Sequence, residues 1–348
     1  QVALDLRLYL RDQIQILRRQ VRELQGVLVA RAGAHLDVIL PGYTHLQPAQ
    51  PVLLAHHLLA YFEMFQRDRD RLAACLERVN VLPLGAGALA GTTFAIDPHT
   101  VAEALGFPRV AANSLDAVAD RDFVAEFLAC AALLMMHLSR LGEEIVLWSS
   151  AEFGFVTLPD ALATGSSMMP QKKNPDVAEL ARGKAGRVYG ALVGILTVLK
   201  GLPLSYNRDL QEDKEGLFDA VDTAQGTVTV MAELLRGLRF RPERMRAAAA
   251  GRHLNATDVA DYLAAKGLPF RAAHAVVGRL VRHCLERGCA IEALSLKDLR
   301  RYSPRFAKDV YEYLTLEACV ARRASPGGTA PAAVRRALRE AASRLKVD

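Results

Sequence analysis

The chain has 348 residues, of which 51% are hydrophobic and 24% charged, so it is long enough for a large buried core and two domains. Lysine and arginine outnumber aspartate and glutamate by 44 to 38, and this net charge of +6 is too diffuse to indicate a nucleic-acid-binding protein. The five cysteines are scattered and odd in number, which favours reduced thiols in a cytoplasmic protein. The longest apolar runs, residues 127–136 and 189–199, are shorter than the roughly 18 to 20 residues of a membrane span.

Helical periodicity begins with the first residues. Apolar side chains recur at three- or four-residue steps over residues 1–34 and again over residues 51–79, which predicts two long amphipathic helices. A third long helix is expected over residues 114–153. These helices leave a short connection at residues 35–50 and a longer one at residues 80–113.

The first connection contains an unusual run. Three prolines and a glycine in residues 40–51 predict a rigid, extended loop, and Pro51 fits the first position of the next helix. Thr44, His45 and Gln47 lie between the prolines without obvious local partners. A loop histidine by itself is more often structural than catalytic, so the local pattern leaves the role of His45 open.

Arg121 lies in the charged segment at the start of the third helix. A surface ion pair explains it as well as a functional role does. The functional alternative is pairing with a substrate carboxylate, because a guanidinium group matches the geometry of a carboxylate.

Residues 164–179 form a polar loop that leads into a helix. Gly165, the two serines after it and Pro170 disfavour regular structure in the first part. In the second part, Asn174 or Asp176 is expected to cap a helix, with Pro175 at its first position and Glu179 about one turn in. Two lysines next to a helix N-terminus gather positive potential, which suits a site that holds a carboxylate and a second developing negative charge.

The helix after this loop is expected over residues 176–200. It is apolar over most of its length, and glycines recur on one side of it. This spacing predicts close helix approach inside a bundle. The glycines are Gly183, Gly186, Gly190 and Gly194. Another helix starts near Gly216, and shorter helices follow from residue 256. The fold class predicted is all-α, with a long-helix bundle domain at residues 1–248 and a smaller C-terminal helical domain at residues 249–348.

Four motifs together resemble the fumarase/aspartase superfamily, in the form found in its argininosuccinate lyase branch. Residues 165–176 read Gly-Ser-Ser-Met-Met-Pro-Gln-Lys-Lys-Asn-Pro-Asp, which is similar to the superfamily's signature loop. The other three are Tyr-Thr-His-Leu-Gln at residues 43–47, Ser-Leu-Asp-Ala-Val-Ala-Asp-Arg-Asp at 114–122 and Tyr-Asn-Arg-Asp-Leu-Gln-Glu-Asp-Lys-Glu at 206–215. The resemblance implies a homotetramer whose long helices form a central bundle and whose active sites each draw on three subunits.

The resemblance also implies an activity, namely elimination of fumarate from argininosuccinate to give arginine, without a cofactor or metal. Ser166 and His45 match the two proton-transfer roles; which of them is the base stays open, with Ser166 favoured. Lys172 and the helix N-terminus would stabilise the dianionic intermediate, and Glu179 would orient His45. The residues that match substrate-binding positions are Thr44, Gln47, Arg121, Asn174, Tyr206, Gln211 and Lys214.

Two alternatives remain open at this point. A sister lyase such as adenylosuccinate lyase would use a similar loop, and a lens-crystallin-like structural relative would keep the fold without activity. In the argininosuccinate lyase branch, a Ser-Arg-Asn-Asp motif directly precedes a stretch like residues 1–8. We therefore expect that the chain lacks an N-terminal domain with substrate contacts, and that by itself it associates but has little or no activity.

Overall fold

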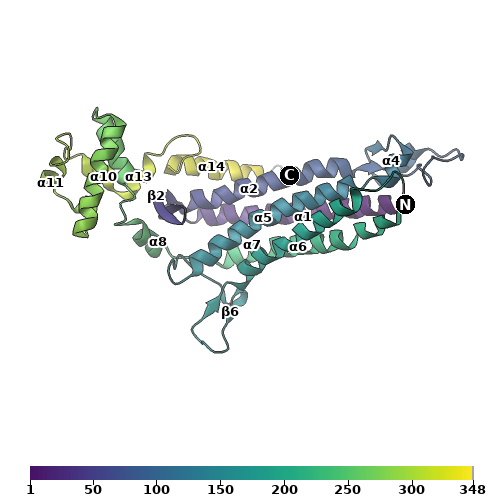
Figure 1. Cartoon of the computed structure of the whole chain (residues 1–348), viewed down its shortest axis with the longest axis horizontal. Helices are drawn as coiled ribbons and strands as arrows, with labels where there is room; N and C mark the ends of the chain where they lie inside the picture. The colour runs from purple at the N-terminus through teal and green to yellow at the C-terminus, as the bar shows by residue number, and fades with distance from the viewer. Residues whose placement is uncertain (347–348) are drawn as a thin grey trace. The chain divides into compact units, whose positions relative to one another are not determined.

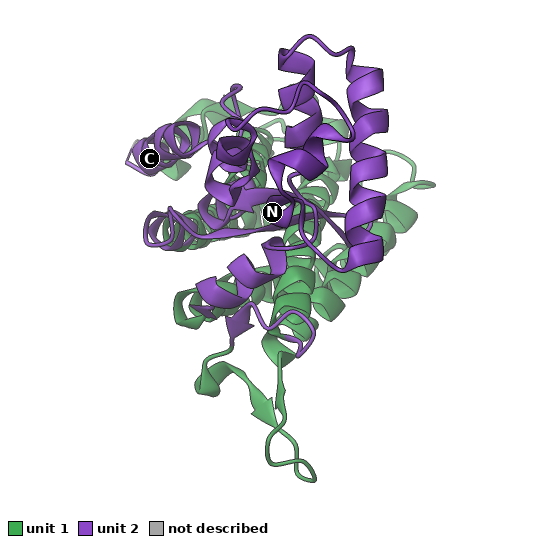
Figure 2. Cartoon of the chain, turned by 90° about the vertical axis from the view of Figure 1, so that its left-hand side faces the viewer, with its two compact units in different colours: residues 1–27, 61–149, 158–238 green, residues 28–60, 150–157, 239–348 purple. Residues whose placement is uncertain are grey.

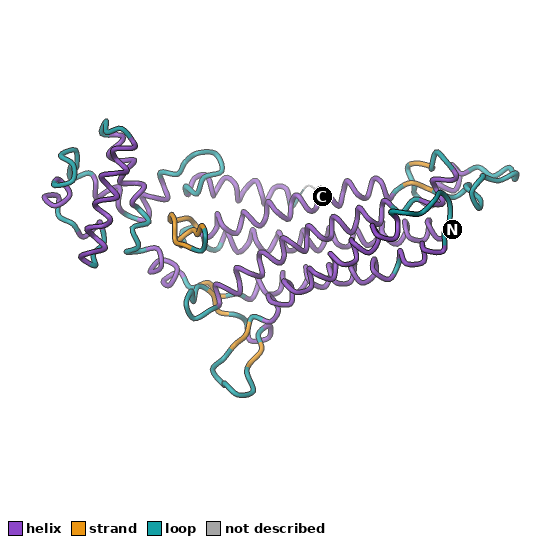
Figure 3. Tube along the Cα trace, viewed as in Figure 1, coloured by secondary structure: helices purple, strands orange, loops and turns teal. Residues whose placement is uncertain are grey.

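The computed structural model describes residues 1–346 and is built mainly of helices (Figures 1 and 3). The predicted all-α fold is confirmed. The long helices are α1 (Val2–Gly33), α2 (Leu54–Val79), α5 (Asp122–Ser149), α6 (Asp176–Leu199) and α7 (Glu215–Gly237). The shorter helices are α3 (Pro98–Leu105), α4 (Ser114–Ala119), α8 (Pro242–Ala249), α9 (Ala256–Ala265), α10 (Phe270–Arg287), α11 (Leu296–Arg300), α12 (Val310–Leu314), α13 (Leu316–Ala321) and α14 (Pro331–Arg344). Three 3₁₀ turns are η1 (Asp160–Leu162), η2 (Arg208–Asp213) and η3 (Ile291–Ala293).

The chain divides into two compact units, shown in Figure 2. Unit 1 comprises residues 1–27, 61–149 and 158–238, and unit 2 comprises residues 28–60, 150–157 and 239–348. The boundary at residue 248 that the sequence suggests remains a prediction.

Helix α5 forms the centre of unit 1, where it packs against α6 and α7. Fifteen of its residues are buried, including Phe127, Leu134 and Leu138. Gly142 permits the close approach of α5 to α6, because a Cβ atom at this position would lie 2.7 Å from the carbonyl oxygen of Ala178. By length and composition α5 could also cross a membrane, but 61% of its most apolar window is buried inside the chain, as in the core helix of a soluble protein.

Helix α6 covers the predicted residues, and its four glycines make no close contact within one chain. A Cβ atom added at Gly183, Gly186, Gly190 or Gly194 would meet no atom within 4 Å, so within one chain these glycines serve no close helix contact. Helix α6 also exposes large apolar side chains. These are Leu180, Tyr189, Val193 and Leu196, with 60%, 41%, 63% and 52% of their surface exposed.

The single helix predicted over residues 114–153 is interrupted, and this prediction was wrong. Helix α4 ends at Ala119, Asp120 adopts an extended backbone (φ −59°, ψ 122°), and α5 starts at Asp122. The Asp120 carboxylate accepts a hydrogen bond from the Asp122 N–H at 2.8 Å, which satisfies one free donor at the start of α5. Asp120 therefore separates two helices instead of lying inside one.

Eight short strands form four two-stranded sheets, which were not predicted from the sequence. The largest is the antiparallel hairpin of β1 (Ile39–Thr44) and β2 (Gln47–Leu53) in unit 2. Residues 40–51 thus form strands instead of the predicted loop, and Pro51 lies in β2, three residues before α2. Prolines are compatible with this hairpin because each strand has an unpaired edge that needs no donor. The small sheets pair β3 (Val81–Leu82) with β4 (Arg109–Val110), β5 (Val156–Thr157) with β8 (Arg239–Phe240), and β6 (Thr164–Gly165) with β7 (Lys173–Asn174).

The C-terminal part of unit 2 has its own apolar core. Side chains of α9, α10 and α12 meet there, among them Leu263, Leu280 and Val310, which are fully buried. Buried Asp258 accepts hydrogen bonds from the guanidinium groups of Arg322 and Arg323 at 2.9 to 3.0 Å, which fixes the C-terminal end of α13 to α9. The predicted site residues all lie outside this core.

Candidate functional site

The signature loop is presented on a small hairpin at the N-terminal end of α6. Residues 166–172 form its tip, and β6 and β7 form its stem, although the sequence predicted no strand here. The Asp176 carboxylate accepts hydrogen bonds from the N–H and the hydroxyl of Thr164 across the stem. The hydroxyl bond is the main reason that the pKa of Asp176 is lowered.

The helix cap differs from the prediction as well. Pro175 occupies the cap position of α6, and neither Asn174 nor Asp176 caps the helix with its side chain. The Asp176 carboxylate accepts hydrogen bonds from Thr164 and does not cap the helix, so the first N–H groups of α6 lack a side-chain acceptor. This leaves the positive end of the α6 dipole available next to the loop.

The predicted catalytic groups of the loop are accessible. The Ser166 hydroxyl is half-buried and accepts hydrogen bonds from the N–H groups of Met168 and Met169 at 3.2 and 3.1 Å, which shape the tip. The Lys172 ammonium donates to Asn174 Oδ1 at 2.6 Å, whereas Lys173 pairs with Asp160. The two lysines therefore differ in their partners. Lys173 pairs with a carboxylate, whereas Lys172 donates to the side-chain amide of Asn174.

A second group of predicted residues lies beyond the C-terminal end of α6, also in unit 1. Tyr206 and Gln211 are exposed, and Lys214 is half-buried. Arg121 is almost fully buried and donates through Nε to Asp213 Oδ2 at 2.5 Å. Of the two alternatives for Arg121, the ion pair exists but is buried instead of lying on the surface, and the role in binding substrate stays a prediction.

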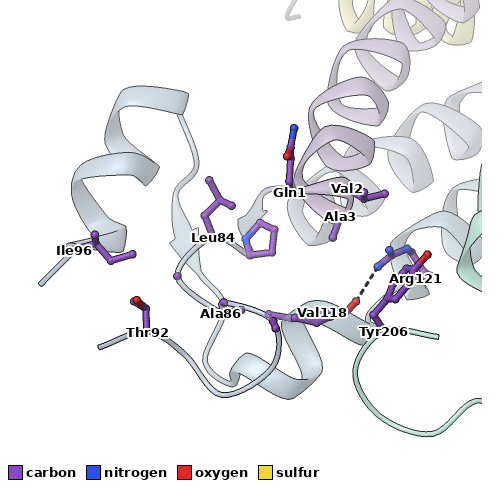
Figure 4. Close-up of a pocket in the computed structure, with 15 residues that line it drawn as sticks. Gln1, Val2, Ala3, Leu84, Ala86, Thr92, Ile96, Val118, Arg121 and Tyr206 are labelled. Atoms are coloured by element: carbon purple, nitrogen blue, oxygen red, sulfur yellow. Dashed lines mark hydrogen bonds between the residues drawn. The ribbon is translucent and has the colours of Figure 1, made fainter. Parts of the chain in front are cut away.

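A pocket of about 520 Å³ opens at this second group (Figure 4). Its walls come from residues 1–3, from the loop at residues 83–88 and from α4, with Arg121 and Tyr206 side by side at one edge. Arg121 is fixed there by its bonds to the carbonyl oxygens of Val118 at 3.2 Å and Asp120 at 2.8 Å. Most of the wall is apolar, and Arg121 is the one charged residue among the described residues that line it.

The third group lies in unit 2, at the tip of the β1–β2 hairpin. Thr44 pairs with Gln47, and His45 and Leu46 form the two-residue turn between them with φ values of 54° and 56°. Positive φ at both central positions is type I′ geometry, which usually requires Asn or Gly. The left-handed backbone costs a non-glycine residue about 1 to 3 kcal/mol, and such strain concentrates at functional positions. The exposed imidazole of His45 is thus held at the tip of a strained turn.

Unit 1 does not bring its two groups together. Helix α6 has 24 residues and lies between them, which at 1.5 Å per residue corresponds to about 36 Å. Ser166, Lys172, Asn174 and Glu179 lie at its first end, and Tyr206, Gln211 and Lys214 follow its second end. A substrate the size of an amino-acid conjugate cannot reach both groups in one copy of unit 1.

One polar residue of the second group was not predicted from the sequence. Asp213 is 1% exposed and accepts hydrogen bonds from both Arg121 and Lys214. Its position between Gln211 and Lys214, two predicted substrate-binding residues, could have marked it as a candidate. The position alone does not show that its side chain is buried.

Two family models match the chain. The Lyase family model matches residues 1–190, and the Argininosuccinate lyase C-terminal model matches residues 253–321. The argininosuccinate lyase of Moorella thermoacetica is 63% identical over 98% of this chain and 74% of its own length. The chain belongs to the argininosuccinate lyase family.

Other relatives agree with this membership. The argininosuccinate lyase of Pelotomaculum thermopropionicum is 60% identical over 99% of this chain and 75% of its own length. Among solved structures, EDDS lyase in complex with formate superimposes with a TM-score of 0.91 at 32% identity, covering 98% of this chain and 70% of that chain. The helical architecture of the argininosuccinate lyase family thus extends to lyases with other substrates.

Proposed function

We propose that the protein cleaves argininosuccinate into arginine and fumarate, the last step of arginine biosynthesis, in the cytoplasm. The observation that carries the proposal is the exposed hairpin that presents Ser166 and Lys172 at the start of α6, in a chain 63% identical to an argininosuccinate lyase. The reaction is a β-elimination, in which a carbon–nitrogen bond breaks after a proton leaves the neighbouring carbon. Arginine leaves through its guanidine nitrogen, and fumarate remains.

In this mechanism Ser166 acts as an alkoxide, which Lys172 and the start of α6 stabilise, and it takes the proton from the carbon next to a carboxylate. The intermediate carries two negative charges, one on the carbanion and one on the adjacent carboxylate. Cationic groups in fixed positions therefore lower the barrier to proton removal. Lys172 and the uncapped start of α6 supply this positive potential. His45, held by its turn and oriented by Glu179, protonates the departing nitrogen.

The remaining predicted residues bind the substrate. Thr44 and Gln47 flank His45 in the hairpin, and Asn174 lies beside Lys172. Tyr206, Gln211, Lys214 and the Arg121 edge of the pocket bind the carboxylates and the amino-acid end. Guanidinium and ammonium groups provide charge-assisted hydrogen bonds for this purpose.

A complete site then requires more than one copy of the chain, and we propose a homotetramer in which three subunits contribute to each site. The separation of about 36 Å along α6 supports this arrangement, because a second copy can place its own hairpin beside Lys214. The exposed glycine-lined face of α6 supports it too, since burial of apolar surface stabilises association by about 25 cal/mol per Å². Glycines that meet no atom in one chain allow close approach of a helix from another copy.

Fumarate release from argininosuccinate by the protein expressed from its complete gene tests the activity. Adenylosuccinate and ethylenediamine disuccinate serve as competing substrates in the same assay. We expect turnover of argininosuccinate to exceed that of both alternatives. Preference for another succinyl substrate, or absence of fumarate release, would contradict the proposal.

Light scattering after size-exclusion chromatography tests the assembly. We expect a tetramer for the unchanged protein and smaller species for Val193→Asp, because a carboxylate on the exposed face of α6 would be buried in the interface. Leu285→Asp is the matched control, since Leu285 is 66% exposed but lies on α10. A monomeric unchanged protein, or equal dissociation in both variants, would contradict this interface.

A further inference from the structure

A buried carboxylate lies between two of the predicted site residues. Asp213 ends the η2 turn, and its side chain is inaccessible to solvent. Its Oδ2 atom accepts from Arg121 Nε at 2.5 Å, and its Oδ1 atom accepts from Lys214 Nζ at 2.6 Å. Both oxygens are thus bonded to cations, one from the α4–α5 junction 92 residues away and one from the next residue.

Two positive groups around one carboxylate explain why Asp213 is tolerated in the interior. A buried ion loses its hydration, and an isolated carboxylate would be strongly destabilising. Arg121 is fixed by carbonyl oxygens as well, so it forms a rigid support for Asp213. Asp213 in turn fixes the ammonium group of Lys214.

The ammonium group of Lys214 can donate one more hydrogen bond than it makes within the chain. Its ammonium group carries three N–H donors. One donates to Asp213, and a second donates to the carbonyl oxygen of Leu210 at 3.2 Å. The Lys214 side chain keeps 32% of its surface exposed, so the third donor is available to an anion from solvent.

We infer that Asp213 is the positioning residue that holds Lys214 for a substrate carboxylate, and that Arg121 supports this position through its Nε bond to Asp213, in addition to its place at the pocket edge. The inference rests on the proposed function, in which Lys214 binds substrate. Asp213 itself does not touch the substrate, because both of its oxygens are used inside the chain. The buried pair therefore belongs to the binding site through Lys214.

The Asp213→Asn variant tests this role. An amide cannot accept from both cations with equal strength, and its NH₂ group would face one of them, so Lys214 loses its fixed position. We expect the KM for argininosuccinate to rise about 10- to 100-fold, the range for losing a hydrogen bond between charged partners. We expect kcat to change much less, because a contact made equally in ground and transition states affects KM.

A double-mutant cycle separates positioning from general damage. If Asp213 acts through Lys214, the KM of Asp213→Asn/Lys214→Met should equal that of Lys214→Met alone. Asp120→Asn is the matched control, because Asp120 pairs with Arg7 at the same junction but contacts no lysine. We expect this control to lower the melting temperature and to leave KM unchanged.

The outcomes distinguish this inference from the proposed function. A folded Asp213→Asn with the KM of the unchanged protein, or independent effects of the two substitutions, would overturn the role of Asp213 while fumarate release persists. If Asp213→Asn does not fold, Asp213→Glu keeps the charge but shifts it by one methylene, and an unchanged KM there would also overturn it. Absence of fumarate release by the unchanged protein would overturn the proposed function and this inference together.

Discussion

The two ends of α6 hold charged groups in opposite environments. At the first end, Lys172, Lys173 and Asp176 make their contacts in an exposed hairpin. Beyond the second end, Arg121 and Asp213 form an ion pair with 2% and 0% of their side chains exposed. Exposed pairs contribute about 0 to 1 kcal/mol to stability, whereas breaking a buried pair costs about 3 to 5 kcal/mol.

This difference in environment suggests different functions for the two ends of α6. The contacts of the hairpin are exposed and weak, so a change in its position would cost little free energy, which suits groups that are proposed to meet a substrate. The junction beyond α6 is rigid, which suits groups that fix the position of others. Substitutions at the first end should therefore alter activity without unfolding, and substitutions at the second end should alter both.

The largest effect is expected for Lys172→Met at the exposed end. In the proposed mechanism this ammonium group stabilises the dianionic intermediate, so its loss should lower turnover by at least about 10³-fold. Lys173→Met is the matched control in the next position, and we expect it to be mild because Lys173 pairs with exposed Asp160. Steady-state kinetics of fumarate release measures both. An equal loss of turnover in both variants would show that the total positive charge of the loop supports the reaction, and that Lys172 has no specific role.

Ser166→Ala and His45→Asn should each lower turnover by about 10²- to 10⁴-fold, the range for loss of a proton-transfer group. Ser167→Ala is the control for the loop, because its exposed side chain has no predicted role. Asparagine is the suitable replacement at residue 45, since it tolerates the φ of 54° that the turn requires. Circular dichroism and light scattering should show an unchanged oligomer. Near-normal turnover of either variant would remove that residue from the mechanism.

Arg121→Met should destabilise unit 1 by about 3 to 5 kcal/mol, because it leaves the buried Asp213 with Lys214 as its remaining cation. Arg236→Met is the control, since Arg236 forms an exposed pair with Glu233 and should contribute at most about 1 kcal/mol. Urea unfolding monitored by circular dichroism compares the two. The contrast between the two ends of α6 would fail if both substitutions cost the same free energy.

The sequence was sufficient for the features that depend on local patterns. Helical periodicity predicted α1 and α6 to within about two residues and the start of α7 to within one, because each helix repeats apolar positions along its own chain. The motif around Ser166 and Lys172 indicated the family without any information on the fold. The motif can be recognised in the sequence because it depends only on the order of its residues, and not on contacts with distant parts of the chain.

The tertiary structure decided the features that depend on partners distant in sequence. The turn at His45 exists because β1 pairs with β2, and prolines concealed this hairpin in the sequence. The glycines of α6 predicted close packing, but whether they face a neighbouring helix or the outside depends on how α5 and α7 pack around α6. The burial of Asp213 beside Lys214 was not visible in the sequence, because it depends on Arg121, which folding brings from 92 positions away to compensate the buried charge.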